Sequence, residues 1–510
     1  MSRPNILFLL SDEHSFRFLG ALPRHAGGEP VSTPTLDRLI AAGTYFTDAY
    51  CQMPLCTPSR LCMLTGREVR AAGAWHNGSV IRPEVATLPG TLADAGYETC
   101  LVGKMHLGGS RQFAGFHHRP YGDLTGETGH QWEPLADEAR HSMRYRTSRA
   151  GVTEIPESLI QDEVVAHETV SFVREHEAAQ PDRPWFVCAS FSRPHFPITA
   201  PKRCVDRYRR QGITRPYVPA TGDAFNHPMS VGMRRGFQAA EVDDDEMMSA
   251  RRAYFAAVTY LDEVIGDLLL RLEADGSLEN TVIVYTTDHG ELAGEHGVWW
   301  KNGWYEGCTR VPLIVSLPED RRGGRGRLES TPVGLIDLFP TLCSLASAEQ
   351  PDGLDGVDLS PALFGSAAPD RPVVCDVLNP RWGDGMEFRM VRHGRFKYVG
   401  FRDAPPLLFD LDSDPLEQRN LIGASGAAGE AQERLSAYVR ETMDFDEAER
   451  ERTERDGPLR ETYAHDLPSL TAGNAYTLPD GRVISADEII YDPRVLAESV
   501  HAAFSDAPHG

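Results

Sequence analysis

The chain has 510 residues, of which 41% are hydrophobic and 25% are charged, as in a globular protein with one large domain and room for a smaller one. Its formal net charge of −23 at pH 7 argues against a nucleic-acid partner or an anionic membrane surface. Any site for an anion must therefore be a local cluster of basic side chains. The nine cysteines show no CxxC spacing, which favours a reducing compartment over a disulfide framework or a structural zinc site.

The N-terminal sequence MSRPNILFLLSDEH contains a short apolar run, residues 6–10, that ends in acidic residues. This run does not have the pattern of a signal peptide, and no stretch of the sequence is apolar for long enough to span a bilayer. We therefore expect a cytoplasmic protein without a membrane partner.

Short apolar runs are typical of buried strands, and the chain has them at residues 5–11, 45–49, 97–102, 185–191, 281–287 and 311–316. Helical patterns separate these runs, at residues 35–42, 88–95, 160–177 and 250–274. The alternation predicts an α/β fold with a large mixed, mainly parallel sheet between layers of helices. Residues 109–155 and 200–247 lack a clear period, so we expect irregular structure there, the first stretch being a long surface excursion of the kind that carries binding loops.

The sequence changes character after about residue 370. Short alternating strands are expected at residues 373–377, 388–392, 396–400 and 407–410, which predicts a small antiparallel sheet. A charged helical pattern follows over residues 427–455 and is typical of a solvated amphipathic helix. We therefore predict a large domain over residues 1–370 and a smaller C-terminal α+β subdomain over residues 371–510.

Four of the predicted strands end in residues that can bind ions or move protons. These residues are Asp12-Glu13-His14, Lys104 with His106, Arg193-Pro194-His195, and Asp288-His289. In parallel α/β sheets, ligands bind beyond the carboxyl ends of the strands, where such side chains meet. Each motif alone is a weak signal, but four of them at one edge predict a single polar site.

The acidic part of this site is suited to a hard divalent cation. Asp12, Glu13 and Asp288 offer carboxylate oxygens, with His289 as a further donor, and such a set suits Ca²⁺, Mg²⁺ or Mn²⁺. Acidic residues after strands also cap helices, which is the simpler interpretation of each one alone. Their convergence on one edge favours the metal site.

The basic part of the site is suited to a tetrahedral oxyanion. Lys104, His106, His195 and Lys301 together could bind such an anion, neutralise charge that develops on it, and move protons. A single histidine at a strand end is more often structural, so the argument depends on the grouping.

Cys56 stands in the sequence CTPSR, at the expected start of a helix. Thr57 could cap the first turn. Pro58 fits there because N–H groups in the first turn of a helix have no acceptor within the helix, so the N–H that proline lacks is not needed. The positive end of the helix, with Arg60 nearby, would then face an anion. The simpler alternative is that Cys56 is a buried apolar thiol, as we expect for Cys62 and Cys188.

The segment CTPSR followed by Leu64-Thr65-Gly66 resembles the signature of the type I formylglycine-dependent sulfatases of the alkaline phosphatase superfamily. Further segments resemble motifs of the same family, especially its choline-sulfatase-like and arylsulfatase-like members: GKMHLG, SRPHFP, DHGE with the later WWK, and LLFDLDSDPLEQRNL at residues 407–421. The resemblance implies a catalytic sulfatase domain in residues 1–370. It also implies hydrolysis of a sulfate ester or sulfamate to an alcohol or amine and inorganic sulfate.

The resemblance assigns a role to each polar residue of the site. Cys56 would be converted to 3-oxoalanine (formylglycine) by a formylglycine-generating enzyme, and the hydrated aldehyde would attack sulfur with one hydroxyl and expel sulfate with the other. The divalent metal, Ca²⁺ or else Mg²⁺ or Mn²⁺, would bind Asp12, Asp288 and the modified Cys56. Glu13 and His289 would also be ligands, although they replace the commoner Asp and Asn.

The basic residues receive separate roles by the same resemblance. Arg60 would hold the aldehyde hydrate, while Lys104 and Lys301 would clamp sulfate oxygens. His106 would take the proton in the elimination step, and His195 would protonate the departing alcohol.

Several alternatives remain open at this point. A phosphonate monoester or phosphodiester hydrolase of the same superfamily would use similar residues, and an inactive relative could survive as an anion-binding protein. Trp75, His76 and Asn77 are candidates for the substrate pocket, together with Lys104, His195 and Lys301. The substrate could be a carbohydrate, aryl, alkyl or choline sulfate, and the oligomeric state is left open.

Overall fold

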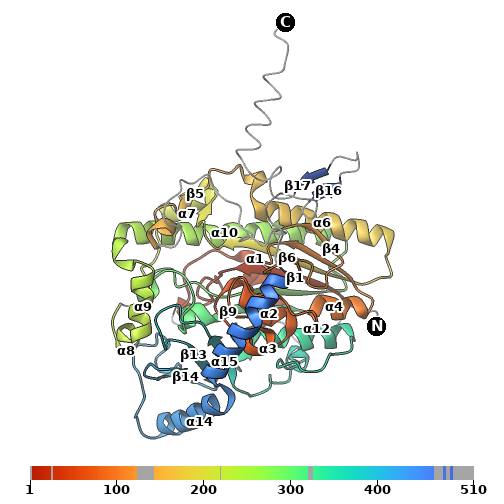
Figure 1. The fold of residues 1–510 in the computed structure, drawn as a ribbon. Coiled ribbons are helices and arrows are strands. Elements are labelled where there is room, and N and C mark those ends of the chain that lie inside the picture. The colour runs from red at the N-terminus through yellow and green to blue at the C-terminus, as the bar shows by residue number, and fades with distance from the viewer. Residues whose placement is uncertain are drawn as a thin grey trace.

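The computed structural model describes residues 3–24, 27–122, 143–218, 220–319 and 326–463, together with two short strands, β16 (Ala475–Thr477) and β17 (Val483–Ser485). Its centre is a large sheet with the strand order β10-β2-β9-β8-β1-β6-β3-β4, and β11 pairs with β2 (Figure 1). The strands are β1 (Asn5–Asp12), β2 (Thr44–Tyr50), β3 (Glu98–Gly103), β4 (His118–Tyr121), β6 (Trp185–Pro194), β8 (Thr281–Thr287), β9 (Arg310–Ser316), β10 (Arg327–Glu329) and β11 (Val333–Gly334).

Four adjacent strands of this sheet, β8, β1, β6 and β3, run parallel to one another. Their carboxyl ends therefore meet at one edge, as the sequence predicts. Strand β9 is antiparallel to both β8 and β2, so the sheet is mixed and mainly parallel. The predicted α/β architecture is confirmed.

Helices cover both faces of the sheet, because its strands are apolar on both sides. One layer contains α1 (Pro34–Ala42), α6 (Gln161–Ala179), α7 (Lys202–Gln211) and α10 (Asp244–Ala274), and the other contains α2 (Cys56–Thr65), α4 (Leu88–Asp94) and α12 (Leu338–Ala346) (Figure 1). Helix α10 begins earlier than residue 250 because Asp243 caps it, accepting a hydrogen bond from the backbone N–H of Glu246 at 2.9 Å.

Two expectations about irregular and helical segments are wrong. Residues 200–247 contain α7 and the short helices α8 (Asp223–Asn226) and α9 (Pro228–Gly236), whose narrow buried faces give too few apolar residues for a clear period. The pattern over 427–455 is not one helix, because the chain breaks between α14 (Ala427–Thr442) and α15 (Phe445–Glu451), where Asp444 caps the second helix.

The surface excursion expected over residues 109–155 is only partly described. It includes β4, α5 (Met143–Thr147) and β5 (Gly151–Val152), which pairs with β7 (Thr199–Ala200), while residues 123–142 lie outside the described residues. Short helices α3 (Val69–Ala72), α11 (Glu306–Thr309), α13 (Ser360–Leu363) and α16 (Gly457–Thr462) complete the described elements of regular α-helix.

The C-terminal sheet forms as the sequence predicts. Strands β12 (Val373–Val377), β13 (Phe388–His393), β14 (Phe396–Phe401) and β15 (Leu407–Asp410) are antiparallel in that order, and α14 packs on them. The domain boundary near residue 370 remains a prediction. No helix in the described part of the chain is long and apolar enough to cross a membrane.

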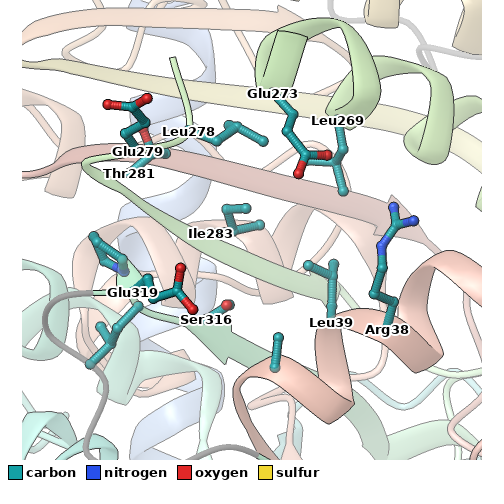
Figure 2. Close-up of a pocket in the computed structure, with 13 residues that line it drawn as sticks. Arg38, Leu39, Leu269, Glu273, Leu278, Glu279, Thr281, Ile283, Ser316 and Glu319 are labelled. Atoms are coloured by element: carbon teal, nitrogen blue, oxygen red, sulfur yellow. The ribbon is translucent and has the colours of Figure 1, made fainter. Parts of the chain in front are cut away.

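A hollow of about 300 Å³ lies between α1, the end of α10 and the starts of β8 and the loop after β9 (Figure 2). Thr281 and Ile283 of β8 line it, whereas Asp288 follows the other end of that strand. Because β8 has seven residues, the two ends lie about 20 Å apart. The hollow is therefore separate from the polar edge of the sheet.

A buried ionic cluster joins the small C-terminal sheet to α11, the short helix that precedes β9. Lys397 of β14 donates to Glu306 Oε1 at 2.9 Å and to Glu417 Oε1 at 2.7 Å, and all three side chains are almost fully buried. Burial and the nearby Glu306 carboxylate raise the pKa of Glu417 to about 7, although Lys397 lowers it. Lys397 and two arginines outweigh burial at Glu306 and hold its pKa at about 2.

This cluster predicts a pH-dependent stability that Glu417→Gln should remove. A glutamate whose pKa is raised in the folded state loses stabilising free energy as the pH rises from its unfolded value, about 4.3, towards 7. Glutamine mimics the protonated form, so the melting temperature of the variant should rise relative to wild type between pH 5 and pH 8. Thermal unfolding across that range measures the difference, and a constant difference would contradict the assignment.

Candidate active site

Asp12 lies at the end of β1, between the neighbouring strands β6 and β8, and is fully buried. Arg60 Nη2 donates to its Oδ2 at 2.9 Å, and the Lys104 ammonium forms an ion pair with the same oxygen. Burial alone would raise the pKa of Asp12, but Lys104, Arg60 and Lys301 outweigh it and hold that pKa well below its usual range. Asp12 is therefore a permanent carboxylate at the centre of the site.

Helix α2 begins at Cys56, but Thr57 does not cap it. The N-cap is Leu55, which has no capping side chain, and Asn77 Oδ1 accepts the Thr57 backbone N–H at 3.3 Å instead. The Thr57 hydroxyl donates to the backbone carbonyls of His106 and Asn77. Our expectation for Thr57 is wrong because its position inside the first turn leaves its hydroxyl closer to loop carbonyls than to the helix amides.

Arg60 contacts the ends of all four parallel strands. Its Nε donates to Asp288 Oδ2 at 2.8 Å and its Nη2 to Asp12. Its Nη1 donates to the Lys104 carbonyl at 2.7 Å and to Ser190 Oγ at 3.1 Å. The guanidinium is 0% exposed, and its rigid fork of donors fits this arrangement in a way that a lysine could not.

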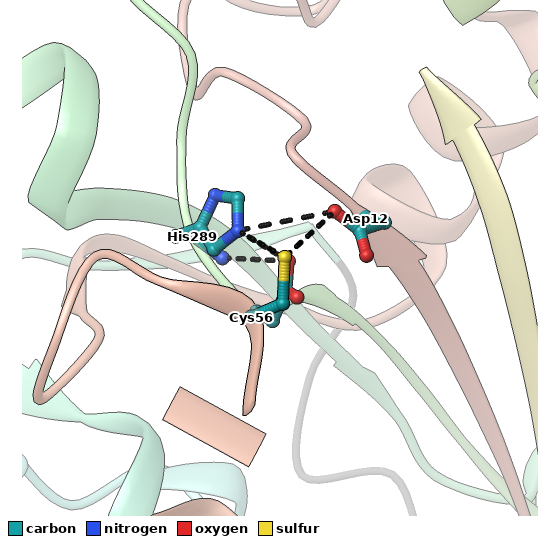
Figure 3. Close-up of side chains that lie close together, drawn as sticks. Asp12, Cys56 and His289 are labelled. Atoms are coloured by element: carbon teal, nitrogen blue, oxygen red, sulfur yellow. Dashed lines mark hydrogen bonds and ion pairs between the residues drawn. The ribbon is translucent and has the colours of Figure 1, made fainter. Parts of the chain in front are cut away.

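The sulfur of Cys56 lies among residues that the sequence predicts for the polar site. His289 Nε2 and Lys301 Nζ are each 3.3 Å from Sγ, while Asp12 Oδ1 and His195 Nε2 are each 3.9 Å away. Figure 3 shows Cys56, His289 and Asp12 pointing towards one another. Burial and Asp12 raise the pKa of Cys56, but Lys301, Lys104 and His289 outweigh them and lower it well below its usual value.

The predicted metal ligands fall into two overlapping groups that share Asp12. The first group is Asp12, Cys56, Asp288 and His289, and the second is Asp12, Glu13 and His195, with the ligand atoms of each group within 4.8 Å of one another. His289 Nδ1 lies 3.0 Å from the Gly290 carbonyl and donates to it, so its Nε2 faces the first group.

Glu13 is held in an unusual conformation beside these groups. Its backbone φ of 65° lies in the left-handed region. Its Oε2 accepts from Lys301 Nζ at 3.0 Å and also lies 3.0 Å from His195 Nε2. Its Oε1 is buried without a hydrogen-bond partner among the described residues. Burial and the nearby Glu291 carboxylate outweigh Lys301 and raise the pKa of Glu13 well above its usual value.

Two of the predicted basic residues, His195 and Lys301, lie beside the Cys56 sulfur. His195 Nδ1 donates to the Phe196 carbonyl at 2.8 Å, so Nε2 faces Glu13 and Cys56. Burial lowers the pKa of Lys301, but the Cys56, Glu13 and Asp12 charges outweigh it and raise that pKa, so the ammonium stays charged. His106 adopts a φ of 53°, and its carbonyl holds the Thr57 hydroxyl.

The three candidates for the substrate pocket occupy different environments. Asn77 contacts the start of α2 through Thr57, and His76 Nε2 bonds to Asp456 Oδ2 at 2.8 Å. Trp75 is 4% exposed and belongs to the hydrophobic core, with its carbonyl bound to Asn379. Their roles in binding substrate remain predictions.

Sequence reasoning missed three residues near the site. Ser190 is a partner of Arg60, and Glu291 accepts the backbone N–H groups of Ala293 and Trp300. The position of Glu291 directly after Asp288-His289-Gly290 could have identified it. Arg146 lies in a stretch without period, where no local pattern distinguishes it from the neighbouring arginines Arg144 and Arg149.

The parallel strand ends bring buried acidic groups and cationic side chains around the Cys56 sulfur, an arrangement suited to a hydrolase for esters of a tetrahedral oxyanion. The family model described as Sulfatase matches residues 4–348, and the model described as the C-terminal part of N-sulphoglucosamine sulphohydrolase matches residues 294–444. The chain belongs to the sulfatase family and is a sulfuric ester hydrolase. The proposed resemblance is therefore confirmed.

Known proteins show how far the likeness extends. The choline-sulfatase of Rhizobium meliloti (strain 1021) is 31% identical over 435 residues, which cover 82% of each chain. A protein solved in complex with its substrate D-glucosamine-2-N,6-O-disulfate has a TM-score of 0.69 at 22% identity, covering 89% of this chain and 99% of the other. The phosphonate monoester hydrolase of Agrobacterium radiobacter has a TM-score of 0.70 at 22% identity, covering 95% and 99%.

The contacts of Arg60 predict a large loss of stability in Arg60→Met. Removing one partner from a buried ion pair leaves the other charge uncompensated, so the free energy of unfolding should fall by about 3–5 kcal/mol. Arg174→Met is the matched control, since Arg174 also pairs through Nε with an aspartate, Asp275, but on the surface. Urea unfolding should resolve the first change and not the second, and equal losses would contradict the role assigned to Arg60.

Proposed function

We propose that this enzyme hydrolyses the sulfate ester of a small molecule at Cys56, after that residue has been converted to formylglycine. The observation that supports this most is the position of the Cys56 sulfur, within 3.9 Å of Asp12, His195, His289 and Lys301. One atom at that place would reach the metal side and the anion side of the site together. A carbohydrate, aryl, alkyl or choline sulfate, or a sulfamate, would fit this chemistry.

The chemistry of the donor set supports the modification. Asp12 and Asp288 supply hard oxygen donors, whereas a thiolate is a soft ligand that suits other metals. A hydroxyl of the aldehyde hydrate would give this position an oxygen as well. Because Cys56 is 1% exposed, we expect the formylglycine-generating enzyme to act before the chain folds.

The residues present fit a divalent cation, and we propose Ca²⁺, with Mg²⁺ or Mn²⁺ as alternatives. Asp12, Asp288, His289 and the modified Cys56 would hold it, and the buried carboxyl group of Glu13 is a further oxygen donor nearby. When bound, such an ion lowers the pKa of a coordinated hydroxyl and offsets negative charge on the sulfate.

The side chains around Cys56 divide the remaining work. Arg60 fixes Asp12 and Asp288 and would orient the hydrated Cys56 position, while Lys104 and Lys301 would bind sulfate oxygens. His195 would protonate the departing oxygen with Nε2, and His106 would take the proton in the elimination step. The nine free cysteines also fit the cytoplasmic location that we propose.

The second candidate is a phosphonate monoester or phosphodiester hydrolase. It is favoured by the fold shared with the phosphonate monoester hydrolase of Agrobacterium radiobacter and by the similar demands of the two oxyanions. Both candidates require the same groups around Cys56, so substrate preference must separate them.

The proposed function predicts a modified Cys56 and a preference for sulfate. Mass spectrometry of the peptide that contains Cys56, from protein made in its native host, should show an aldehyde or its hydrate in place of the thiol. The value of kcat/KM should then be higher for an aryl sulfate than for the matched aryl phosphate and phosphonate esters. An intact thiol would overturn the mechanism, and a preference for the phosphonate would favour the second candidate.

The donor set predicts stabilisation by added metal. A ligand that binds only the folded state adds about 2.7 kcal/mol at one hundred times its Kd, so Ca²⁺ should raise the melting temperature of the metal-free protein. Asp288→Asn should lose most of this increment. Asp376→Asn is the matched control, because Asp376 is another buried aspartate paired with an arginine, Arg389, and it should keep the increment. Equal increments in both variants would exclude Asp288 as a ligand.

The position of His195 predicts a dependence on the leaving group. A good leaving group needs no proton in the transition state, so His195→Ala should spare activated aryl sulfates far more than alkyl sulfates. The measured quantity is kcat/KM over a leaving-group series. His227→Ala controls for the loss of a buried imidazole elsewhere, since His227 Nε2 bonds to the Pro405 carbonyl. An equal loss on aryl and alkyl substrates would remove His195 from this role.

A further inference from the structure

Arg146 of α5 places its guanidinium against two aromatic rings beside the active site. Its Cζ lies 3.4 Å from the centroid of the Phe196 ring and also lies over the ring of Trp300. Its Nε and Nη1 are out of contact with solvent and have no hydrogen-bond acceptor among the described residues. A guanidinium has five N–H donors, so most of its binding capacity is unused.

The two rings connect Arg146 to the residues that we assign to catalysis. The Phe196 ring lies 4.3 Å from the imidazole of His195, and Trp300 directly precedes Lys301. Phe237 packs against Trp300 at 4.8 Å and extends the aromatic wall. The guanidinium is therefore one side chain away from the proposed proton donor to the leaving group.

Two deeply buried arginines, Arg251 and Arg389, show the usual alternative, in which carboxylates and carbonyls accept from the guanidinium. Arg251 donates to Glu29 and to the carbonyls of Thr214 and Ala293. Arg389 donates to Asp376 and Glu68. Both of these residues have a structural role that accounts for their burial, whereas Arg146 packs on two rings and its Nε and Nη1 have no acceptor among the described residues.

Shielding a charged guanidinium from water costs free energy unless a ligand accepts hydrogen bonds from it. Burial outweighs the attraction of Glu13 and Glu291 and lowers the pKa of Arg146 well below its usual value. Cation–π contacts with Phe196 and Trp300 recover only part of this cost, about 0.5–2 kcal/mol. A charge-assisted hydrogen bond to an anion would satisfy the donors more fully.

We propose that Arg146 binds a second anionic group of the substrate, a carboxylate or a second sulfate, on the leaving-group side of the ester. This inference rests on the proposed function, because it places the scissile sulfate at Cys56. It makes the preferred substrate a sulfate ester with at least one further negative charge. A cationic leaving group, such as choline, would instead be repelled by Arg146.

The test uses three aryl sulfates that differ only in one ring substituent, ortho or meta to the ester: a carboxylate, a second sulfate or an uncharged carboxamide. Wild type should prefer an anionic member over the carboxamide by about tenfold to a hundredfold in kcat/KM, the size expected for one hydrogen bond to a charged group. Comparing the carboxylate with the second sulfate identifies which anion the site takes.

Arg146→Gln should reduce that preference, mainly through KM, and Arg146→Lys should keep part of it because the charge remains. Arg144→Gln is the matched control, since Arg144 lies on the same helix and is exposed, and it should retain the full preference. Thermal unfolding of each variant checks that it folds. Equal losses on charged and uncharged substrates in Arg146→Gln would overturn the inference.

The outcomes separate this inference from the proposed function. Turnover of the carboxamide sulfate without any preference for the anionic members would overturn the role of Arg146 and leave the sulfatase assignment intact. No turnover of any aryl sulfate by protein with a modified Cys56 would overturn both.

Discussion

The active site depends on one buried guanidinium. Arg60 reaches the ends of β1, β3, β6 and β8 from a single helix, through Asp12, the Lys104 carbonyl, Ser190 and Asp288. A parallel sheet brings strand ends to one edge, but it does not by itself fix their side chains. Arg60 supplies that constraint, and because it stands one helical turn after Cys56, it also fixes the start of α2 relative to the sheet.

The site concentrates opposite charges that would be unstable alone. Lys104 and Lys301 outweigh the effect of burial at both Asp12 and Cys56 and hold the pKa of each below its usual value. Glu13 is the exception, since burial and Glu291 prevail there and favour its protonated form. This arrangement keeps cations and donors fixed in a water-poor space, which is the condition under which electrostatic stabilisation of a transferring group is strongest.

Much of this could be predicted from the sequence. The apolar runs predict the central strands. The polar residues at positions 12, 104, 195 and 288 indicate the edge of the sheet at which the ends of these strands meet. Thr57 shows one limit, because a hydroxyl near a helix start can bond to helix amides or to loop carbonyls, and only the packed loops at His106 and Asn77 decide between them. Arg146 shows another, since its position over Phe196 and Trp300 arises from residues far apart in the chain. The helices within 200–247 are hard to predict because they are short and their buried faces carry few apolar residues, so tertiary packing must stabilise them.

The antiparallel pairing of β8 with β9 has a consequence for how such a site can change. The connection between these strands leaves and returns at the same edge of the sheet, so Asp288 at its beginning and Lys301 within it belong to one continuous loop. Asp288 serves the acidic side and Lys301 the basic side, and both approach Cys56. An insertion or deletion between Asp288 and Lys301 would therefore shift one side of the site relative to the other, so we expect this loop to tolerate changes of length poorly.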